Sequence, residues 1–286
     1  MTIRRERIPS IDPRLNRHIN HDDRSRQYAF DTSGLSIVST KHQRRIAVLN
    51  QGNLGSCTGN AGVGCLGTDP YYETIPSRTE PLLVAQGTYS FDEAGAVALY
   101  SDATAADDYP GQYPPTDTGS DGLTIAKVLK AHGLISGYQH TFSLDDALKA
   151  LGVTPVICGT SWLQDMFDPA ADGRLTVSGA VAGGHEYVVD EVDAEHRRVW
   201  LTNSWGTGWG VDGRAYLTFE DFGTLLADSG DVTIFTPLTQ PAPTPADPDH
   251  VLALAAHTWI GRHHTTIAGN AKMATALRRW LAAKGL

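Results

Sequence analysis

A glycine-rich stretch behind a cysteine is the sequence feature that most restricts the fold. The segment CTGNAGVGCLG (57–67) is long enough for a short helix, yet it contains Gly59, Gly62 and Gly64. Each of these glycines costs about 1 kcal/mol relative to alanine in a helix interior. Such a helix is stable only where it packs tightly inside the protein, since small residues permit a close approach. The sequence therefore predicts a buried helix that begins at Cys57.

The composition is that of an ordinary soluble protein with one large domain or two. Of its 286 residues, 41% are hydrophobic and 19% are charged, and no apolar run is long enough to span a bilayer. The basic N-terminus lacks the apolar segment of a secretory signal. Three cysteines are too few for a disulfide scaffold, and the odd number leaves at least one free thiol. We expect a chain that is cytoplasmic at synthesis and does not bind membranes.

The charges are distributed unevenly along the chain. Residues 1–45 carry ten basic against five acidic side chains, whereas residues 46–248 carry eight against twenty-six. Residues 249–286 are basic again, with five against one. An acidic body with basic ends is a poor match for a polyanion, so we expect no nucleic-acid partner.

Helical patterns come first in the chain and strand patterns second. Helices are expected at 90–100, 122–133 and 143–152, with Ser90 and Ser143 as N-caps and Gly152 as a left-handed C-cap. Five short β-branched or aromatic runs follow. They are TPVICGT, EYVVDEVD, RRVWLTNS, RAYLTFED and DVTIFTPL. This order predicts an α+β protein with a helical half and an antiparallel sheet half.

Four regions are predicted along the chain. Residues 1–45 form an extended, surface-hugging basic arm, and residues 46–236 form the main domain. Prolines mark a semi-rigid linker over 237–248. The last region, 249–286, has the pattern of two helices, and its basic, tryptophan-bearing face is a possible docking surface for a partner.

Three polar residues have the order and placement of a nucleophilic site. Cys57 begins a predicted helix, where the dipole favours a thiolate. His185 follows two glycines and opens a strand, so its ring is held on a rigid element. Asn203 ends the next strand, where it can pair with a group on its neighbour. A cysteine, a histidine base and an orienting amide on two halves of one protein predict an enzyme with a cleft.

The motifs around these residues resemble those of papain-like cysteine peptidases, in the bacterial and phage branch of that superfamily. The resemblance rests on QGNLGSC (51–57), on Gly183-Gly184-His185 and on NSWGTGWG (203–210), in the family's order. It implies two lobes, one helical and one resembling an antiparallel β-barrel, with the active site in the cleft between them. It also suggests an actinobacterial or phage origin and a phage-associated location.

The resemblance also implies roles for individual residues. Cys57 is the nucleophile and His185 its base, and later the acid for the leaving amine. Asn203 orients the imidazole, and Gln51 donates its side-chain amide to the oxyanion. Trp205 shields the hydrogen bond between His185 and Asn203. Trp205, Gly184 and Trp162 are the candidates for contact with substrate, although a hydrophobic cluster explains Trp162 equally well. No metal and no cofactor is expected.

Two positions depart from the best-known members of the family, and they keep other functions open. Thr58 replaces an aromatic residue, and Glu186 replaces a small residue after the histidine. We expect the Glu186 carboxylate to point into solvent. The first prediction is hydrolysis of peptide bonds in a protein or peptide substrate. The alternatives are a lysin that cuts cell-wall peptides and a papain-like scaffold without catalysis that serves binding or assembly.

Overall fold

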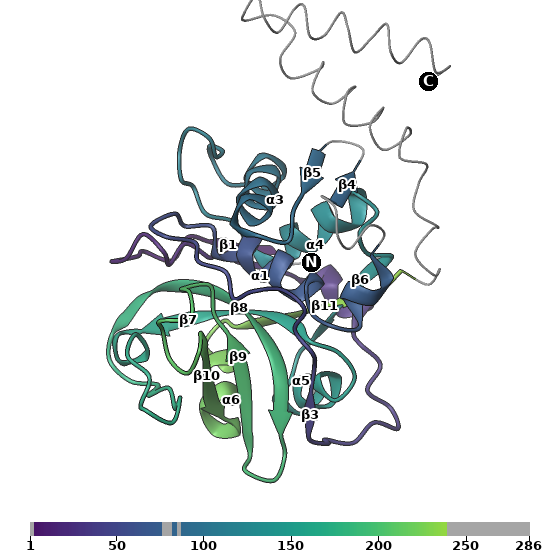
Figure 1. The fold of residues 1–286 in the computed structure, drawn as a ribbon, viewed down its shortest axis with the longest axis vertical. Coiled ribbons are helices and arrows are strands. Elements are labelled where there is room, and N and C mark those ends of the chain that lie inside the picture. Colours follow the sequence, from purple (N-terminus) through teal and green to yellow (C-terminus); the bar gives the residue numbers. More distant parts are fainter. Residues whose placement is uncertain (1–2, 76–81, 85–86, 239–286) are drawn as a thin grey trace, which may run out of the picture.

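The computed structural model describes residues 3–75, 82–84 and 87–238, and the predicted helices of 249–286 lie outside this range. Helices α1, α3 and α4 gather in the upper half of Figure 1, and strands β7 to β10 lie in the lower half together with α5 and α6. The helical half holds four helices and one hairpin. These are α1 (Cys57–Leu66), α2 (Tyr71–Thr74), α3 (Glu93–Ala106), α4 (Gly122–Ala131), β4 (Leu82–Val84) and β5 (Gly87–Tyr89).

The other half is built on an antiparallel sheet with the order β10-β9-β8-β7-β11-β6, and β3 also pairs with β8. Its members are β3 (Thr40–Lys41), β6 (Gly137–Thr141), β7 (Val156–Leu163), β8 (Val181–Asp193), β9 (Arg198–Thr202), β10 (Arg214–Thr218) and β11 (Asp231–Thr236). Helices α5 (Leu144–Leu151) and α6 (Phe219–Ala227) and the short 3-10 helix η2 (Gln164–Met166) complete this half. The predicted α+β class is confirmed.

Helix α1 is the central element, and every one of its residues is buried. A Cβ at Gly59 would lie 2.3 Å from the carbonyl oxygen of Ala96, and one at Gly62 would lie 2.7 Å from Leu99, both on α3. On another side of the helix, Gly64 approaches Val188 of β8. The glycines therefore let α1 pack against a helix and the sheet at once, as the sequence predicts.

The helix caps follow the predictions only in part. Ser143 caps α5 by accepting the N–H of Asp146, as expected. Helix α3 is instead capped by Asp92, which accepts the N–H of Gly95, so the predicted cap at Ser90 is wrong. Gly152 has ordinary right-handed angles, which corrects the predicted left-handed cap.

The last part of the run RAYLTFED also differs from the prediction. The strand stops at Thr218, whose side chain accepts the N–H of Asp221 and thereby starts α6. The pattern Thr-x-x-Asp is an N-cap signal that the aromatic character of this run concealed.

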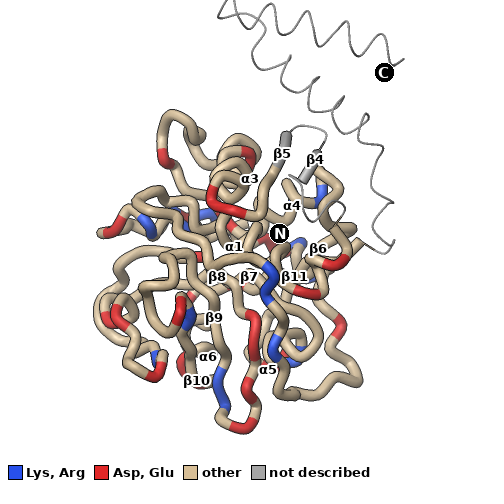
Figure 2. The backbone as a smooth tube through the Cα atoms, viewed as in Figure 1, with Lys and Arg blue, Asp and Glu red and all other residues tan. Residues whose placement is uncertain are grey.

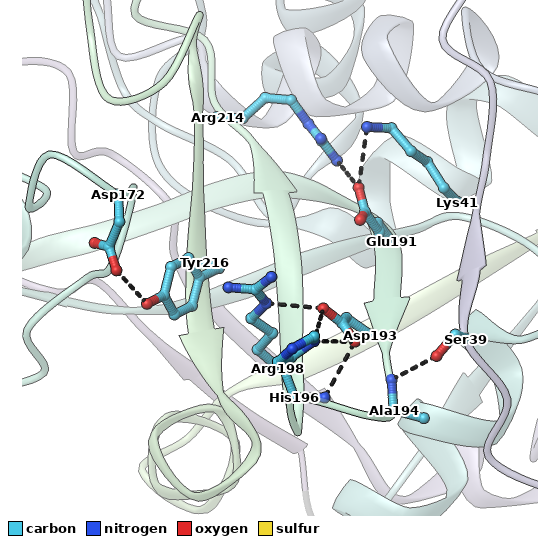
Figure 3. Close-up of polar contacts among 10 residues, drawn as sticks. All are labelled: Ser39, Lys41, Asp172, Glu191, Asp193, Ala194, His196, Arg198, Arg214 and Tyr216. Carbon is cyan, nitrogen blue, oxygen red and sulfur yellow. Dashed lines mark hydrogen bonds and ion pairs between the residues drawn. The ribbon is translucent and has the colours of Figure 1, made fainter.

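Charged side chains hold the rim of the sheet together (Figure 3). Glu191 of β8 forms ion pairs with Arg214 at 2.9 Å and with Lys41 at 3.3 Å, so β10 and β3 are both linked to β8. Asp193 accepts from Arg198 and His196 at the predicted hairpin between β8 and β9. Acidic positions are spread over both halves (Figure 2).

The N-terminal arm is not confined to the surface, which corrects the prediction. It contains β1 (Ile3–Glu6), β2 (Ile19–Asp22) and the 3-10 helix η1 (Asp23–Tyr28), and β1 pairs with β2. Between these strands, Leu15 and Arg17 are fully buried. The purple arm in Figure 1 crosses the molecule between the two halves. In the described ranges, no helix combines the length and apolarity that crossing a membrane would require.

The close contact at Gly59 gives a stability prediction. Alanine improves helix propensity by about 1 kcal/mol, but here its Cβ meets a backbone oxygen that cannot move aside cheaply. We expect Gly59→Ala to lower the free energy of unfolding by about 1–3 kcal/mol in urea denaturation. Gly208→Ala is the control, since nothing lies within 4 Å of a Cβ there. Equal effects of the two substitutions would contradict this account of α1.

Candidate active site

Cys57 occupies the first position of α1 and faces the sheet half. Its thiol is fully buried, beside the backbone N–H groups of Asn16 and Glu186. The N–H groups in the first turn of a helix have no intrahelical partner, so the Cys57 N–H is available as a donor at this point.

His185 and Asn203 come together from neighbouring strands. Nε2 of His185 donates to Oδ1 of Asn203 at 2.7 Å, and the same oxygen accepts the N–H of Ser204 at 2.8 Å. Because Oδ1 can only accept, the neutral imidazole carries its proton on Nε2 and a lone pair on Nδ1. Nδ1 is buried and has no hydrogen-bond partner among the described residues. His185 is therefore set up to receive a proton through Nδ1.

Gln51 is fixed by the same loop that carries Asn203. Its Oε1 accepts from the Ser204 hydroxyl at 2.7 Å, and its backbone N–H donates to the Ser204 carbonyl at 2.9 Å. One more backbone bond joins Gly206 to Leu49 at 3.0 Å. The segments that precede Cys57 and follow β9 are thus braced against each other. Ser204 is a positioning residue that the sequence analysis missed, although it is part of a motif quoted there.

Aromatic rings enclose the imidazole. The ring of Trp205 lies 5.0 Å from that of His185 and stacks on Phe167 at 5.6 Å. The ring centroid of Trp162 on β7 lies 4.9 Å from that of His185 and 5.2 Å from that of Trp205. Trp162 is fully buried in the core of the sheet half, so the hydrophobic-cluster interpretation describes it. The Trp205 ring thus lies against the imidazole, and both His185 and Asn203 are buried.

The arm runs directly across this site, between strand β8 of the sheet half and the segment that precedes α4 in the helical half. On the sheet side, the N–H of Arg17 donates to the Gly184 carbonyl at 3.0 Å. On the helical side, Ser120 accepts the N–H of His18 at 2.8 Å and donates to the Asn16 carbonyl at 3.3 Å. A Cβ at Gly184 would lie 2.2 Å from the Arg17 oxygen, so the glycine makes this backbone approach possible.

The side-chain amide of Gln51, which the resemblance assigns as a donor to the oxyanion, is hydrogen-bonded to a carbonyl group of the arm. Nε2 of Gln51 donates to the Arg14 carbonyl oxygen at 3.1 Å and to Leu54 at 2.7 Å. The Arg14 guanidinium lies over the Trp205 ring, 4.2 Å from its centroid, in a cation–π contact. The arm therefore places a peptide group where a substrate carbonyl is expected.

Burial under the arm suppresses the charges of the site. It raises the pKa of the Cys57 thiol to about 12, and the nearby Glu186 carboxylate adds to this effect. Burial also lowers the pKa of His185 to about 4. The state with the arm in place has a neutral thiol and a neutral imidazole, which corrects the expectation that the helix start alone would favour a thiolate.

Glu186 is buried, and the prediction that it points into solvent is wrong. It follows His185 on β8, but its carboxylate turns inward to the Arg17 side chain, whose Nε lies 4.0 Å away. Burial raises the pKa of this carboxyl group well above its usual range. No sequence signal separated the two faces of β8, because both are covered along most of the strand.

A separate cavity of about 340 Å³ lies beside β11 and α6. Asn20, His21, Asp121, His140 and Asp231 are among its lining residues, whereas Cys57, His185 and Asn203 are not. Within the part of the chain that the structure describes, no group of three histidine, cysteine or acidic side chains is placed to hold a metal ion.

Comparison with solved structures identifies the fold. Xylellain, a cysteine protease from Xylella fastidiosa, matches with a TM-score of 0.60 and 16% identity, over 83% of this chain and 99% of that chain. The cysteine protease CMS1MS2 from Carica candamarcensis matches with a TM-score of 0.45 and 16% identity, over 68% and 94%. The ragweed pollen allergen Amb a 11, a cysteine protease in its proform, gives 0.48 and 18%, over 75% and 70%.

No protein-family model matches the sequence, and neither does any curated protein. The similarity is therefore one of structure. The chain has the fold of papain-like cysteine proteases, as its motifs predict.

The buried arm gives a pH-dependent stability prediction. His18 is buried against Tyr109 and bonds the Thr118 carbonyl through Nε2 at 2.6 Å, and burial lowers its pKa to about 4. The unfolded chain has the ordinary histidine pKa of about 6.5 and binds the proton more readily, so the folded state loses stability as pH falls from 6.5 toward 4. We expect His18 to account for about 2 kcal/mol of the loss between pH 8 and pH 5.

The substitution His18→Gln keeps a donor for Thr118 but removes the titration. We expect the free energy of unfolding in urea to fall by about 2 kcal/mol less between pH 8 and pH 5 in this variant than in the unmodified chain. His196→Gln is the matched control, since the His196 side chain is exposed on the hairpin. An unchanged pH dependence in His18→Gln would show that this imidazole is not held neutral by the fold.

Proposed function

We propose that the chain is a cysteine peptidase that hydrolyses peptide bonds through a thioester on Cys57. The observation that carries the proposal is the arrangement around His185 and Gln51. His185 is oriented by Asn203 and keeps Nδ1 free, while Gln51 already donates to a peptide carbonyl, that of Arg14. Acyl transfer needs a base with a free lone pair, and it needs a hydrogen-bond donor directed at the carbonyl oxygen.

Acylation begins when a substrate peptide takes the place of the arm. Nδ1 of His185 accepts the Cys57 proton, and the thiolate attacks the substrate carbonyl carbon. The Gln51 amide and the Cys57 N–H stabilise the oxyanion that forms. The imidazolium then donates its proton to the departing nitrogen, the C–N bond breaks, and the thioester remains on Cys57.

Deacylation repeats these proton transfers with water. His185 accepts a proton from water as the oxygen attacks the thioester carbon. The oxyanion again lies at Gln51 and the Cys57 N–H. The C–S bond breaks, the carboxylic acid product leaves, and the proton on His185 returns to the sulfur. Asn203 holds the ring in one orientation throughout, since Oδ1 accepts from Nε2 in both charge states.

The arm makes the described state a resting state. It fills the position of the substrate carbonyl and leaves both Cys57 and His185 fully buried and neutral. Displacement of the arm exposes the pair to water and removes the desolvation that opposes a thiolate and an imidazolium. Hydrolysis therefore requires that the segment around Leu15 leaves the cleft.

A labelling experiment tests this resting state. Leu15 is fully buried, so Leu15→Ala should weaken the docking of the arm by about 2 kcal/mol or more, roughly a 30-fold change in the docking equilibrium. We expect an epoxide that requires a thiolate to label Cys57 at least about tenfold faster in this variant at pH 6. Mass spectrometry of the peptides that contain Cys57, Cys65 and Cys158 provides the measurement. Ile11→Ala is the control, because Ile11 belongs to the same arm but is 71% exposed. Equal labelling rates in the two variants would argue against occlusion by Leu15.

Substitutions in the Leu15→Ala chain test the chemistry. Cys57→Ala should abolish hydrolysis of a protein substrate, and His185→Ala should do the same. Gln51→Ala should lower kcat by about 10²- to 10³-fold through loss of an oxyanion donor. Asn203→Ala should keep a measurable rate, about 100-fold lower, because it misplaces the base without removing it.

The same set of variants decides between the functions that the sequence leaves open. Release of peptides from purified peptidoglycan, with no cleavage of protein, would replace the proposal with the lysin. Full hydrolysis in Cys57→Ala, or none in any variant, would overturn the proposal, and the second result would favour the scaffold without catalysis.

A further inference from the structure

One arginine of the arm is enclosed completely inside the protein. Arg17 has no exposed surface, although it belongs to a segment outside the main domain predicted from the sequence. Its Nη2 donates to the carboxylate of Asp231 and to the carbonyl oxygen of Ser229, the latter at 3.1 Å. Its Nε faces the Glu186 carboxylate at 4.0 Å. A side chain of the arm therefore fills a pocket with two acidic groups.

The pocket walls come from three adjacent strands of the sheet. Asp231 begins β11, Glu186 lies on β8, and Gly159 lies on β7 between them, where it pairs with both of these residues. A Cβ at Gly159 would lie 2.5 Å from Nε of Arg17 and 2.6 Å from Glu186. The absence of a side chain at this one position makes the space for the guanidinium.

The pocket adjoins the reacting groups. Glu186 directly follows His185, and its backbone N–H lies beside the Cys57 thiol together with that of Asn16. The N–H of Arg17 is the group that donates to Gly184, which precedes His185. A chain that passes the thiol in contact with Gly184 thus places a side chain in this pocket.

The fit of the arm's own arginine is incomplete. Both carboxylate oxygens of Glu186 are buried without a hydrogen-bond partner among the described residues, as are Nε and Nη1 of Arg17. Buried polar atoms without partners cost free energy, so the arm gains less from this pocket than a well-placed guanidinium would. An arginine on another chain does not share the backbone contacts of the arm and can take a position in which it bonds Glu186.

We propose that this pocket, once the arm has left it, binds the arginine side chain of a peptide substrate beside the bond that is cleaved. The inference rests on the proposed peptidase function and adds the substrate class to it. Two acidic side chains, Glu186 fully buried and Asp231 partly exposed, favour a guanidinium, which can bond both of them through its planar fork. An apolar side chain would leave the buried Glu186 carboxyl group without a partner, and sites of this kind discriminate strongly against such a group.

The first test compares peptides on the full chain with Leu15→Ala and Arg17→Ala, which weaken the docking of the arm and empty the pocket. Fluorogenic peptides carry arginine at each of the three positions before the cleaved amide, and matched peptides carry leucine there. We expect kcat/KM to be at least about tenfold higher for one arginine peptide than for its leucine counterpart. Adding Asp231→Asn should lower this ratio about tenfold.

Asp228→Asn is the matched control in the same chain. Asp228 lies three residues before Asp231, but its carboxylate accepts from Ser161 at 2.9 Å, so the ratio should not change. Hydrolysis of leucine peptides as fast as arginine peptides would overturn the pocket and leave the peptidase intact. Absence of hydrolysis, with Cys57 unlabelled by the epoxide, would overturn the peptidase itself.

A binding measurement tests the pocket without catalysis. Acetyl-arginine amide at millimolar concentration should raise the Tm of Arg17→Ala, because a ligand that binds only the folded state stabilises it. Acetyl-leucine amide should not, and neither compound should shift the unmodified chain, in which Arg17 fills the pocket. Equal shifts with both amides, or none with either, would show that the emptied pocket does not recognise a guanidinium.

Discussion

The burial of α1 is the constraint on which the site depends. Cys57 can face the sheet only because Gly59, Gly62 and Gly64 leave room along the helix behind it, so that α3 and β8 approach its backbone from two sides. A helix with larger residues would stand farther from β8 and would take the thiol away from the strand that carries His185. The low helix propensity of the glycines is thus offset by the close packing that they allow, as is common where function overrides local preference.

A second set of contacts fixes the positions of Gln51 and Asn203 relative to each other. Ser204 bonds Gln51 twice, and its own N–H bonds the oxygen of Asn203 that orients the imidazole. The side chains of Gln51 and Asn203 are therefore held by one residue, although 152 positions separate them in the sequence. Displacement of the loop that carries Ser204 would move both side chains together, and under the proposed mechanism this couples base orientation to oxyanion binding.

The sequence predicted the parts of the site whose chemistry is local and missed those that depend on distant packing. The motifs identify Cys57, His185, Asn203 and Gln51, and the glycines identify a buried helix. The inward direction of Glu186 could not be read from a strand that is covered on both faces. The burial of Arg17 was equally hidden, because an arginine in a polar, basic segment is usually solvated. Its partners, Glu186 and Asp231, lie 169 and 214 residues further along the chain.

The arm resembles a substrate in its contacts and differs from one in its energetics. It offers a carbonyl to Gln51 and an N–H to Gly184, yet its arginine leaves Glu186 without a hydrogen bond. A segment tethered to the domain needs little affinity, because its effective concentration at the cleft is high. A free peptide lacks that high effective concentration, so it must bind with higher affinity through better contacts in the same pocket. The incomplete bonding of Arg17 therefore lets the pocket hold the arm in the resting state and still exchange it for a peptide whose arginine bonds both acidic groups.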